Sequence, residues 1–268
     1  MGEPVETKLS VNLNKVALLR NQRDVGYPSV LDAARLVLHA GAHGVTVHPR
    51  PDERHVRRSD VLELTQLLAA EFDRSVEYNI EGYPSPGFIE LVLEVRPDQV
   101  TLVPDAPEQR TSDHGWDVKE SFGRLRTVIG DLKRSGARIS LFMDPDPGAI
   151  ASAATVGADR IELYTGPYAH AFAAGEPGPL LRRYADAAKA AEEAGLGVNA
   201  GHDLNLDNLP AFVHALPQLA EVSIGHAITA DALRIGFAAA VEAYLRALRR
   251  IPGALHPHPS LSHRGGGS

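Results

Sequence analysis

Short runs in which apolar and polar residues alternate recur along the chain, and each follows a segment whose apolar residues have helical spacing. Four of these units have a glycine at the junction, namely Gly41, Gly136, Gly157 and Gly195. A glycine directly after a helix adopts the left-handed conformation at little cost. The pattern therefore predicts helix-to-strand turns, which we place in segments 39–48, 134–144, 155–165 and 193–202.

Four further strand-like runs bring the number of predicted strands to eight: KLSVNL (8–13), SVEYNI (75–80), QVTLVP (99–104) and EVSIGH (221–226). The clearest helical patterns between the strands span 29–40, 59–72, 179–194 and 231–250. Strands that alternate with helices form a parallel sheet. Eight such units in about 250 residues are typical of a closed (β/α)8 barrel, also called a TIM barrel. We expect one α/β domain over residues 1–251; an open doubly wound sheet is the alternative, and no glycine-rich phosphate loop supports it.

The predicted strands are not apolar throughout, although parallel strands covered on both faces usually are. Residues 44–48 read GVTVH, and residues 160–164 read RIELY. We expect the apolar positions to face the helices and the polar positions to face the barrel interior. A buried polar group costs several kcal/mol unless it is hydrogen-bonded. Two interpretations stay open: a polar ligand site that reaches into the barrel mouth, or a polar core whose groups satisfy one another.

Composition narrows the class of ligand. The 268 residues include 27 Lys and Arg against 34 Asp and Glu, for a net charge of −7. An acidic chain without a long basic run binds nucleic acid or membranes poorly, so we expect its cationic groups to bind small anions.

The chain has no cysteine, a polar start and no apolar run near the roughly 20 residues of a membrane span, which leads us to expect a cytoplasmic protein. Residues 252–268 are expected to be disordered.

The active site of such a barrel lies at the C-terminal ends of its strands. The polar side chains predicted there are Asn12, His48, Glu77, Asp144, Thr165, His202 and His226. Several histidines at separately predicted strand ends are typical of acid–base chemistry. Glu77 would lie in a partly dry interior, where burial raises the pKa of a carboxyl group and a nearby cation lowers it. We predict proton transfer by Glu77, while Glu162 is a similar acid that could simply orient its neighbours.

Two groups of residues near the strand ends predict anion sites. Arg50 and His55 lie on the loop after the second strand. The seventh and eighth strands end in NAGH and SIGH, where Gly201 and Gly225 let backbone amides approach a phosphate, and Arg23 follows the neighbouring first strand. Two anion sites indicate two phosphorylated ligands or one bisphosphate.

With these residues assembled, the chain resembles the pyridoxine 5′-phosphate synthases, the ring-forming enzymes of one vitamin B6 route. The resemblance runs from about Lys8 to Arg249 through LSVNLNKVALLRNQR, GVTVHPRPDERHV, TLVPDAPEQRTSDHGWDV, IELYTGPYA, GVNAGHDLN and SIGHAI. It implies a (β/α)8 barrel that condenses 3-amino-2-oxopropyl phosphate (aminoacetone phosphate) with 1-deoxy-D-xylulose 5-phosphate to pyridoxine 5′-phosphate, phosphate and water. These two phosphorylated substrates agree with the two predicted anion sites.

The resemblance also implies roles for individual residues. By motif position, His48 and Glu77 resemble the family's proton acceptors and His202 its proton donor. The residues implied to contact aminoacetone phosphate are Asn12, Arg23, Asp203, Gly225 and His226. Those implied to contact the deoxyxylulose phosphate are Asn14, Lys15, Arg50, His55 and Thr111. Because each step moves a proton, no redox cofactor is expected and no metal is implied, and the family's assembly implies a homo-octamer.

The chain departs from the family's usual residues in two places. Asn14 and Lys15 stand where the family has Asp-His, and Asp203 stands where it has Gly. A carboxylate beside a phosphate repels it, so we expect Asp203 to make a main-chain contact. Two other functions stay open: a phosphate-binding barrel without turnover, which these departures favour, and a metal-dependent hydrolase. Histidine and glutamate side chains at the strand ends are zinc-ligand types, but the sequence lacks a close pair of them.

Overall fold

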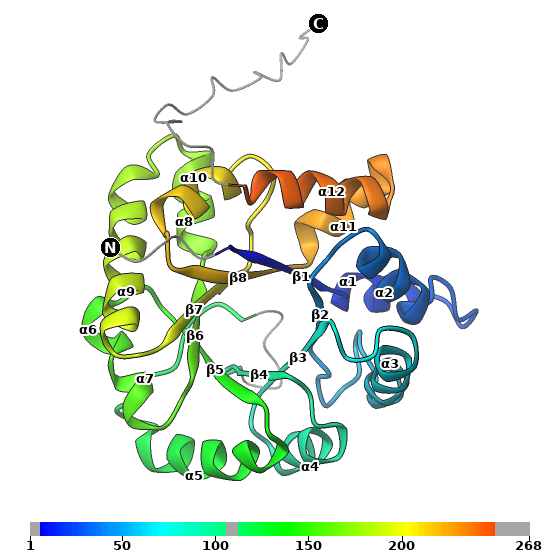
Figure 1. Ribbon diagram of the computed structural model, residues 1–268, viewed down its shortest axis with the longest axis horizontal. Coiled ribbons are helices and arrows are strands. Elements are labelled where there is room, and N and C mark those ends of the chain that lie inside the picture. The colour runs from blue at the N-terminus through cyan, green and yellow to red at the C-terminus, as the bar shows by residue number, and fades with distance from the viewer. Residues whose placement is uncertain (1–5, 106–111, 250–268) are drawn as a thin grey trace, which may run out of the picture.

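The computed structural model describes residues 6–105 and 112–249. Within them, eight parallel strands close into a barrel in the order of the chain, with the last strand paired to the first. The helices surround the strands (Figure 1). The predicted (β/α)8 barrel is confirmed, while the tail 252–268 lies outside the described residues.

The strands are short, as the alternating runs predict. Their bounds are Lys8–Asn12 (β1), Gly44–Val47 (β2), Glu77–Gly82 (β3), Gln99–Leu102 (β4), Arg138–Met143 (β5), Arg160–Tyr164 (β6), Gly197–Gly201 (β7) and Leu219–Ile224 (β8). The third strand begins and ends two residues later than predicted, because its pairing with β2 places Glu77 opposite Gly44. Glu77 is therefore the first residue of β3, and Glu81 lies near its end.

The helices agree with the predicted segments with one exception. Their bounds are Asn14–Arg20 (α1), Val30–His39 (α2), Arg58–Glu71 (α3), Pro86–Val95 (α4), Phe122–Leu132 (α5), Pro147–Ile150 (α6), Ser152–Thr155 (α7), Gly166–Ala173 (α8), Gly178–Glu193 (α9), Leu209–Ala215 (α10), His226–Ile235 (α11) and Phe237–Ala247 (α12), with a 3₁₀ turn at Lys133–Ser135 (η1). The segment 231–250, predicted as one helix, is divided between α11 and α12 because Gly236 has a φ of +84°. The four junction glycines have φ between +77° and +100°, which confirms the predicted turns.

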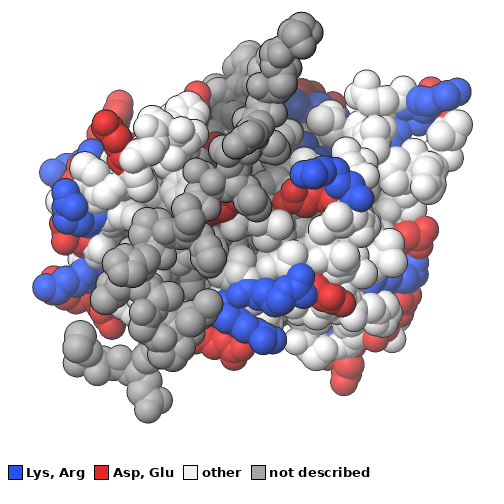
Figure 2. Space-filling model, turned by 90° about the horizontal axis from the view of Figure 1, so that it is seen from above, with Lys and Arg blue, Asp and Glu red and all other residues white. Residues whose placement is uncertain are grey.

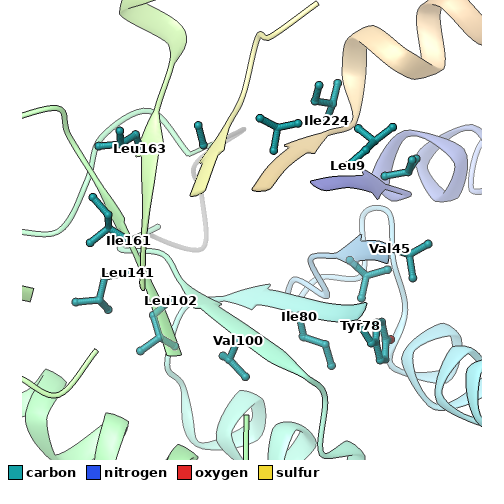
Figure 3. Close-up of a cluster of buried hydrophobic side chains, with 14 of the residues drawn as sticks. Leu9, Val45, Tyr78, Ile80, Val100, Leu102, Leu141, Ile161, Leu163 and Ile224 are labelled. Atoms are coloured by element: carbon teal, nitrogen blue, oxygen red, sulfur yellow. The ribbon is translucent and has the colours of Figure 1, made fainter. Parts of the chain in front are cut away.

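The apolar residues of the strands lie between the barrel and the helices (Figure 3). Leu9, Val45, Ile80 and Leu141 are fully buried there. Tyr78 shares this layer, and its hydroxyl donates a hydrogen bond to a backbone carbonyl in α3. Complete burial of one such side chain contributes about 1.5–3 kcal/mol to folding. The hydrophobic core is therefore a layer outside the strands, as the alternation predicts.

The polar residues of the strands fill the middle of the barrel. The hydroxyls of Ser10 and Thr46 lie 2.7 Å apart. The side-chain amide of Asn79 donates to Thr46 Oγ1 (3.3 Å), and its carbonyl accepts from Thr101 Oγ1 (3.2 Å). All four residues are almost completely buried. These four groups therefore satisfy one another, as one of the two interpretations of the sequence predicts. The hydroxyls of Ser140 and Ser223 in the same layer are buried without a hydrogen-bond partner among the described residues, so the polar core is only partly self-satisfied.

A charged layer lies at the N-terminal end of the barrel. The Glu77 carboxylate forms an ion pair with Arg138 at the start of β5. Glu221 accepts a hydrogen bond from Gln99 (3.3 Å), and its Oε2 lies 3.9 Å from Arg160 Nη1. Burial opposes ionisation of Glu77, but Glu221 and the two arginines hold its pKa below the ordinary value. Burial and the neighbouring Glu77 raise the pKa of Glu221, so Glu77 is the ionised member of this pair.

Charges of both signs are interspersed on the face that Figure 2 presents. Ion pairs between exposed side chains, such as Arg58 with Glu94, accompany this pattern. Across residues 6–105 and 112–249, no helix is long and apolar enough to cross a membrane.

Candidate functional site

Residues at or just after the ends of the first three strands form a closed ring of contacts at the C-terminal end of the barrel. Asn12 Nδ2 donates to Glu81 Oε2 (3.3 Å), and the same oxygen lies 3.9 Å from His48 Nδ1. The backbone N–H of His48 donates to Asn14 Oδ1 (2.9 Å). The backbone N–H of Asn14 in turn donates to Asn12 Oδ1 (2.9 Å). Each residue therefore fixes the orientation of the next.

His48 follows β2 directly and is 7% exposed. Burial, together with the positive charge of Arg50 and the neighbouring His55, lowers the pKa of His48 well below its ordinary value of 6.5. The imidazole is therefore neutral at neutral pH and has a nitrogen available to accept a proton. The structure places this histidine at the mouth, as predicted.

A cationic corner of Lys15, Arg50 and His55 lies beside His48. The rings of His48 and His55 are 6.1 Å apart between centroids. Burial and the charges of Arg50 and Lys15 lower the pKa of His55 to about 4. His55 Nδ1 accepts a hydrogen bond from the next backbone N–H (2.9 Å), so its hydrogen is on Nε2. This corner brings together three residues that the family resemblance assigns to one phosphate.

Arg50 is held by an acid that the sequence did not indicate. It is 5% exposed and forms an ion pair with Asp105, which is 2% exposed and follows β4. Ser112 Oγ donates to the same carboxylate oxygen, Oδ2 (2.7 Å). The other oxygen of Asp105 is buried without a hydrogen-bond partner in the described part of the chain. Part of the positive charge of Arg50 is therefore neutralised from inside the protein.

His202 follows β7 in the left-handed conformation, with φ of +76°. Its ring packs against Phe142 (5.0 Å between centroids) and Tyr164 (5.9 Å). Burial lowers the pKa of His202, while the carboxylates of Asp203 and Asp105 oppose this shift. Its Nδ1 is buried and has no hydrogen-bond partner among residues 6–105 and 112–249.

The glycines at the ends of β7 and β8 make room for neighbouring side chains. A Cβ atom on Gly201 would lie 2.4 Å from Glu162 Oε1, and one on Gly225 would lie 3.0 Å from Asn12 Cβ. The left-handed residues of this region are instead His202 and Asp203, the latter with φ of +56°. Glycine is the residue best suited to that conformation, and aspartate tolerates it better than most. An aspartate can therefore occupy position 203, where the family usually has glycine.

Two carboxyl groups, Glu81 and Glu162, lie inside the mouth. Glu162 is 1% exposed, and burial raises its pKa to about 7, although the nearby Thr101 hydroxyl opposes this shift. Burial, with the charges of Glu162 and Asp105, raises the pKa of Glu81 well above its ordinary value. Both groups therefore retain a proton at a higher pH than exposed glutamates do.

Glu77 does not lie at the mouth, and the prediction that placed it there is wrong. It begins β3 and lies four positions before Glu81, which corresponds to roughly 13 Å along the strand. The cause is the two-residue displacement of β3. Glu77, Asn79 and Glu81 belong to one alternating set, so the pattern identified the correct face of the strand but not the correct end.

The remaining predicted residues are more scattered. Arg23 and His226 are exposed, and the Arg23 side chain forms no hydrogen bond or ion pair with another described residue. Thr111 lies outside the described residues.

In the described ranges, no group of three or more His, Asp or Glu side chains has an arrangement that could hold a metal ion. Glu81 and Asp105 are the residues of the mouth that sequence reasoning missed.

Comparison with known proteins shows both the fold and the family. The alpha subunit of tryptophan synthase from Legionella pneumophila shares the fold with a TM-score of 0.59 at 13% identity, over 90% of this chain and 92% of that one. The pyridoxine 5′-phosphate synthase of Albidiferax ferrireducens is 57% identical over 90% of this chain and 97% of its own length. That of Chelativorans sp. is also 57% identical, over 90% and 98%. The family profile described as "Pyridoxal phosphate biosynthesis protein PdxJ" matches residues 9–250, and the chain belongs to this family.

Proposed function

We propose that the protein is a pyridoxine 5′-phosphate synthase, which condenses aminoacetone phosphate with 1-deoxy-D-xylulose 5-phosphate. The observation that carries the proposal is the mouth itself, where a neutral buried histidine, His48, lies beside the cationic corner of Lys15, Arg50 and His55. Relatives of that name that are 57% identical over nearly their whole length support it. The metal-dependent hydrolase is not favoured by these relatives.

The reaction requires repeated proton transfers at one place. The substrate amine attacks the ketone of the sugar phosphate, and water leaves to give an imine. Removal of a carbon-bound proton gives an enamine, and loss of phosphate and further water precedes ring closure. In our proposal His48 accepts protons in these steps, because burial keeps its imidazole neutral. The resemblance also implies an acceptor role for Glu77. This role stays a prediction that the position of Glu77, at the N-terminal end of the barrel and away from His48, does not support.

The phosphate groups anchor the two substrates. In our proposal Arg50 and the Nε2–H of His55 bind the sugar phosphate, and Lys15 contributes from the same corner; the support is that Arg50 and Lys15 both act on the pKa of His55. The ends of β7 and β8, with Gly225 and the main chain of Asp203, are the proposed site for aminoacetone phosphate. Holding two reactants in one orientation can contribute about 7–11 kcal/mol toward the barrier.

His202 is the proposed proton donor. Burial lowers its pKa in the unliganded protein, so the ring is largely neutral before substrates bind. A phosphate dianion bound nearby favours the protonated form of a histidine. Substrate binding would thus charge His202 at the stage when a leaving hydroxyl needs a proton.

The test is product formation from both phosphates in the presence of EDTA, followed by chromatography of pyridoxine 5′-phosphate. We expect product, with turnover reduced about 10²–10⁴-fold in His48→Asn. The matched control is His214→Asn, because His214 is an exposed residue of α10. If product formed only in the absence of chelator, the site would require a metal ion, as the hydrolase alternative does. Tight binding of either phosphate without product would support a binding barrel.

We also propose a cytoplasmic homo-oligomer, an octamer as the family resemblance implies. Large apolar side chains on α11 and the α1–α2 connection supply surface for subunit contacts, with Tyr27 and Leu233 each 78% exposed. Light scattering of the purified protein gives the number of subunits, and a monomer at micromolar concentration would contradict this proposal.

A further inference from the structure

The end of α1 contacts the loop that carries His55, and the proposed mechanism does not use this contact. We infer that Arg20 and Asn21 are positioning residues, which hold the backbone of His55 so that its ring meets the phosphate of the sugar substrate. This inference deepens the proposed function and rests on it, since it names the groups that prepare the proposed binding site for deoxyxylulose phosphate.

A buried ion pair anchors this arrangement. Arg20 is the last residue of α1 and is 8% exposed, and its partner Asp60 in α3 is 4% exposed. Nη1 of the arginine pairs with one carboxylate oxygen, and Nη2 lies 2.9 Å from the other, Oδ2. Oδ2 also accepts a hydrogen bond from the backbone N–H of Arg57 (2.7 Å), the residue before α3. Because a forked arginine–carboxylate pair has a fixed geometry, it joins α1 rigidly to the start of α3.

Arg20 and Asn21 together hold two carbonyl groups of the loop after β2. Arg20 Nη2 donates to the carbonyl oxygen of His55 (3.1 Å), and Asn21 Nδ2 donates to the same oxygen (2.8 Å). Asn21 Nδ2 also donates to the carbonyl oxygen of Glu53 (3.1 Å). Arg20 Nε donates to Asn21 Oδ1 (3.1 Å), which turns the NH₂ end of this amide towards the loop. We call Arg20, Asn21 and Asp60 the clamp.

The loop requires such support because little of it is buried. Residues 51–53 are exposed, and Glu53 has a left-handed φ of +51°. A residue other than glycine persists in that conformation where its surroundings fix it. The backbone N–H of Glu53 donates to the Arg50 carbonyl (3.0 Å), and its carboxylate accepts from the backbone of Arg58 (2.9 Å). Its third contact, with Asn21, joins the loop to α1.

The held backbone determines where the ring of His55 lies. His55 Nδ1 accepts a hydrogen bond from the backbone N–H of Val56 (2.9 Å), a residue with no exposed surface. The ring is therefore tied to a peptide whose carbonyl group the clamp fixes. Lys15, whose charge also acts on His55, lies in the first turn of the same helix, α1. Loss of the clamp should therefore misplace the Nε2–H of His55 without removing any group that binds the substrate.

The first variant is Asn21→Asp, which keeps an oxygen for Arg20 but places a second oxygen, which cannot donate, against the two carbonyl groups. The buried pair of Arg20 and Asp60 stays complete, so the protein should fold. A hydrogen bond to an ionised phosphate is worth about 10- to 150-fold in affinity, so we expect KM for deoxyxylulose phosphate to rise at least about tenfold. KM for aminoacetone phosphate and kcat should stay within about threefold. The matched control is Gln22→Glu, which adds the same charge at the next, exposed position.

The second variant, Arg20→Lys, separates positioning from stability. Lysine keeps a positive charge for Asp60, but its single ammonium group lacks the fork that also reaches His55. We expect KM for deoxyxylulose phosphate to rise as in Asn21→Asp. If the arginine served the stability of the fold alone, lysine would leave this KM at the value of the parent. The matched control is Arg35→Lys, since Arg35 forms a forked pair with Glu71 on the surface.

Two measurements do not depend on turnover. The Val56 amide hydrogen should exchange faster in Asn21→Asp and Arg20→Lys and at the rate of the parent in the controls, because this amide donates to His55. Calorimetry with deoxyxylulose phosphate alone should show the loss of affinity that KM shows. Equal increases of KM for both phosphates, or unchanged affinity for the sugar phosphate in Asn21→Asp, would overturn the inference. If the parent formed no product, the proposed function would fail, while exchange and calorimetry would still decide the role of the clamp.

Discussion

Replacement of Arg50 by alanine tests how the protein shares one cation between an internal acid and a substrate phosphate. Arg50 pairs with Asp105 in a nearly solvent-free environment. A charge-assisted hydrogen bond to phosphate is worth about 1.5–3 kcal/mol, so its loss should raise KM for the deoxyxylulose phosphate about 10- to 150-fold. KM for aminoacetone phosphate should change much less, because its proposed site lies at the ends of β7 and β8.

The same substitution should also destabilise the fold. Among the described residues, Asp105 would keep a buried negative charge with the hydrogen bond from Ser112 alone, and removal of one partner of a buried pair costs about 3–5 kcal/mol. In the double variant Arg50→Ala/Asp105→Asn the unpaired charge is gone. The free energy of unfolding should then recover most of that loss, while KM for the sugar phosphate stays high.

Initial rates with each substrate varied in turn, and urea unfolding of the same preparations, give both quantities. Arg54→Ala is the matched control, since it removes a cation of the same loop whose partner, Asp52, is exposed; such pairs contribute at most about 1 kcal/mol. Equal increases of KM for both phosphates would mean that the two sites are assigned to the wrong substrates. A double variant as unstable as Arg50→Ala would refute the account of Asp105.

Three further changes test other parts of the site. Glu77→Gln should leave turnover within about tenfold of the parent, because Glu77 lies roughly 13 Å from the mouth; a loss of 10²-fold or more in steady-state rates would restore its role as proton acceptor. Burial raises the pKa of Glu162 to about 7 from 4.5, so the folded state loses stability as the pH rises between those values. In urea unfolding, Glu162→Gln should therefore exceed the parent in stability at pH 8 but not at pH 4.5. Asp203→Gly removes a carboxylate from a left-handed position, so KM for aminoacetone phosphate should fall while the thermal midpoint changes little.

Features of the fold that depend on residues adjacent in the chain could be predicted from the sequence. Each junction glycine, such as Gly41 or Gly157, follows a helix and precedes a strand, and its positive φ is a local requirement. The polar positions of the strands were also assigned to the correct side, because alternation is a property of a single strand. The break at Gly236 was missed, since the apolar spacing of α11 and α12 continues across it.

The site was less predictable because its contacts join distant parts of the chain. In SVEYNIEG the residues Glu81 and Gly82 resemble the start of a turn, and only their pairing with Thr101 and Leu102 of β4 shows that the strand continues through them. Arg50 and Asp105 are 55 positions apart, and nothing within TLVPDAP indicates which cation the acid will meet. Apart from the end of β3, the strand ends at the mouth were predicted closely, but the partner of each side chain depended on the register between strands.

Burial acts in opposite directions on the two kinds of titratable group at the mouth. It lowers the pKa of His48 and raises those of Glu81 and Glu162, so the imidazole becomes a weaker base and the carboxylates become stronger bases than usual. Groups of both kinds can then exchange protons with a substrate near neutral pH, which suits a reaction with several proton transfers. At the base of the barrel Arg138 instead keeps Glu77 ionised. The same polar interior therefore provides a fixed ion pair at one end and, at the other, groups whose protons can move.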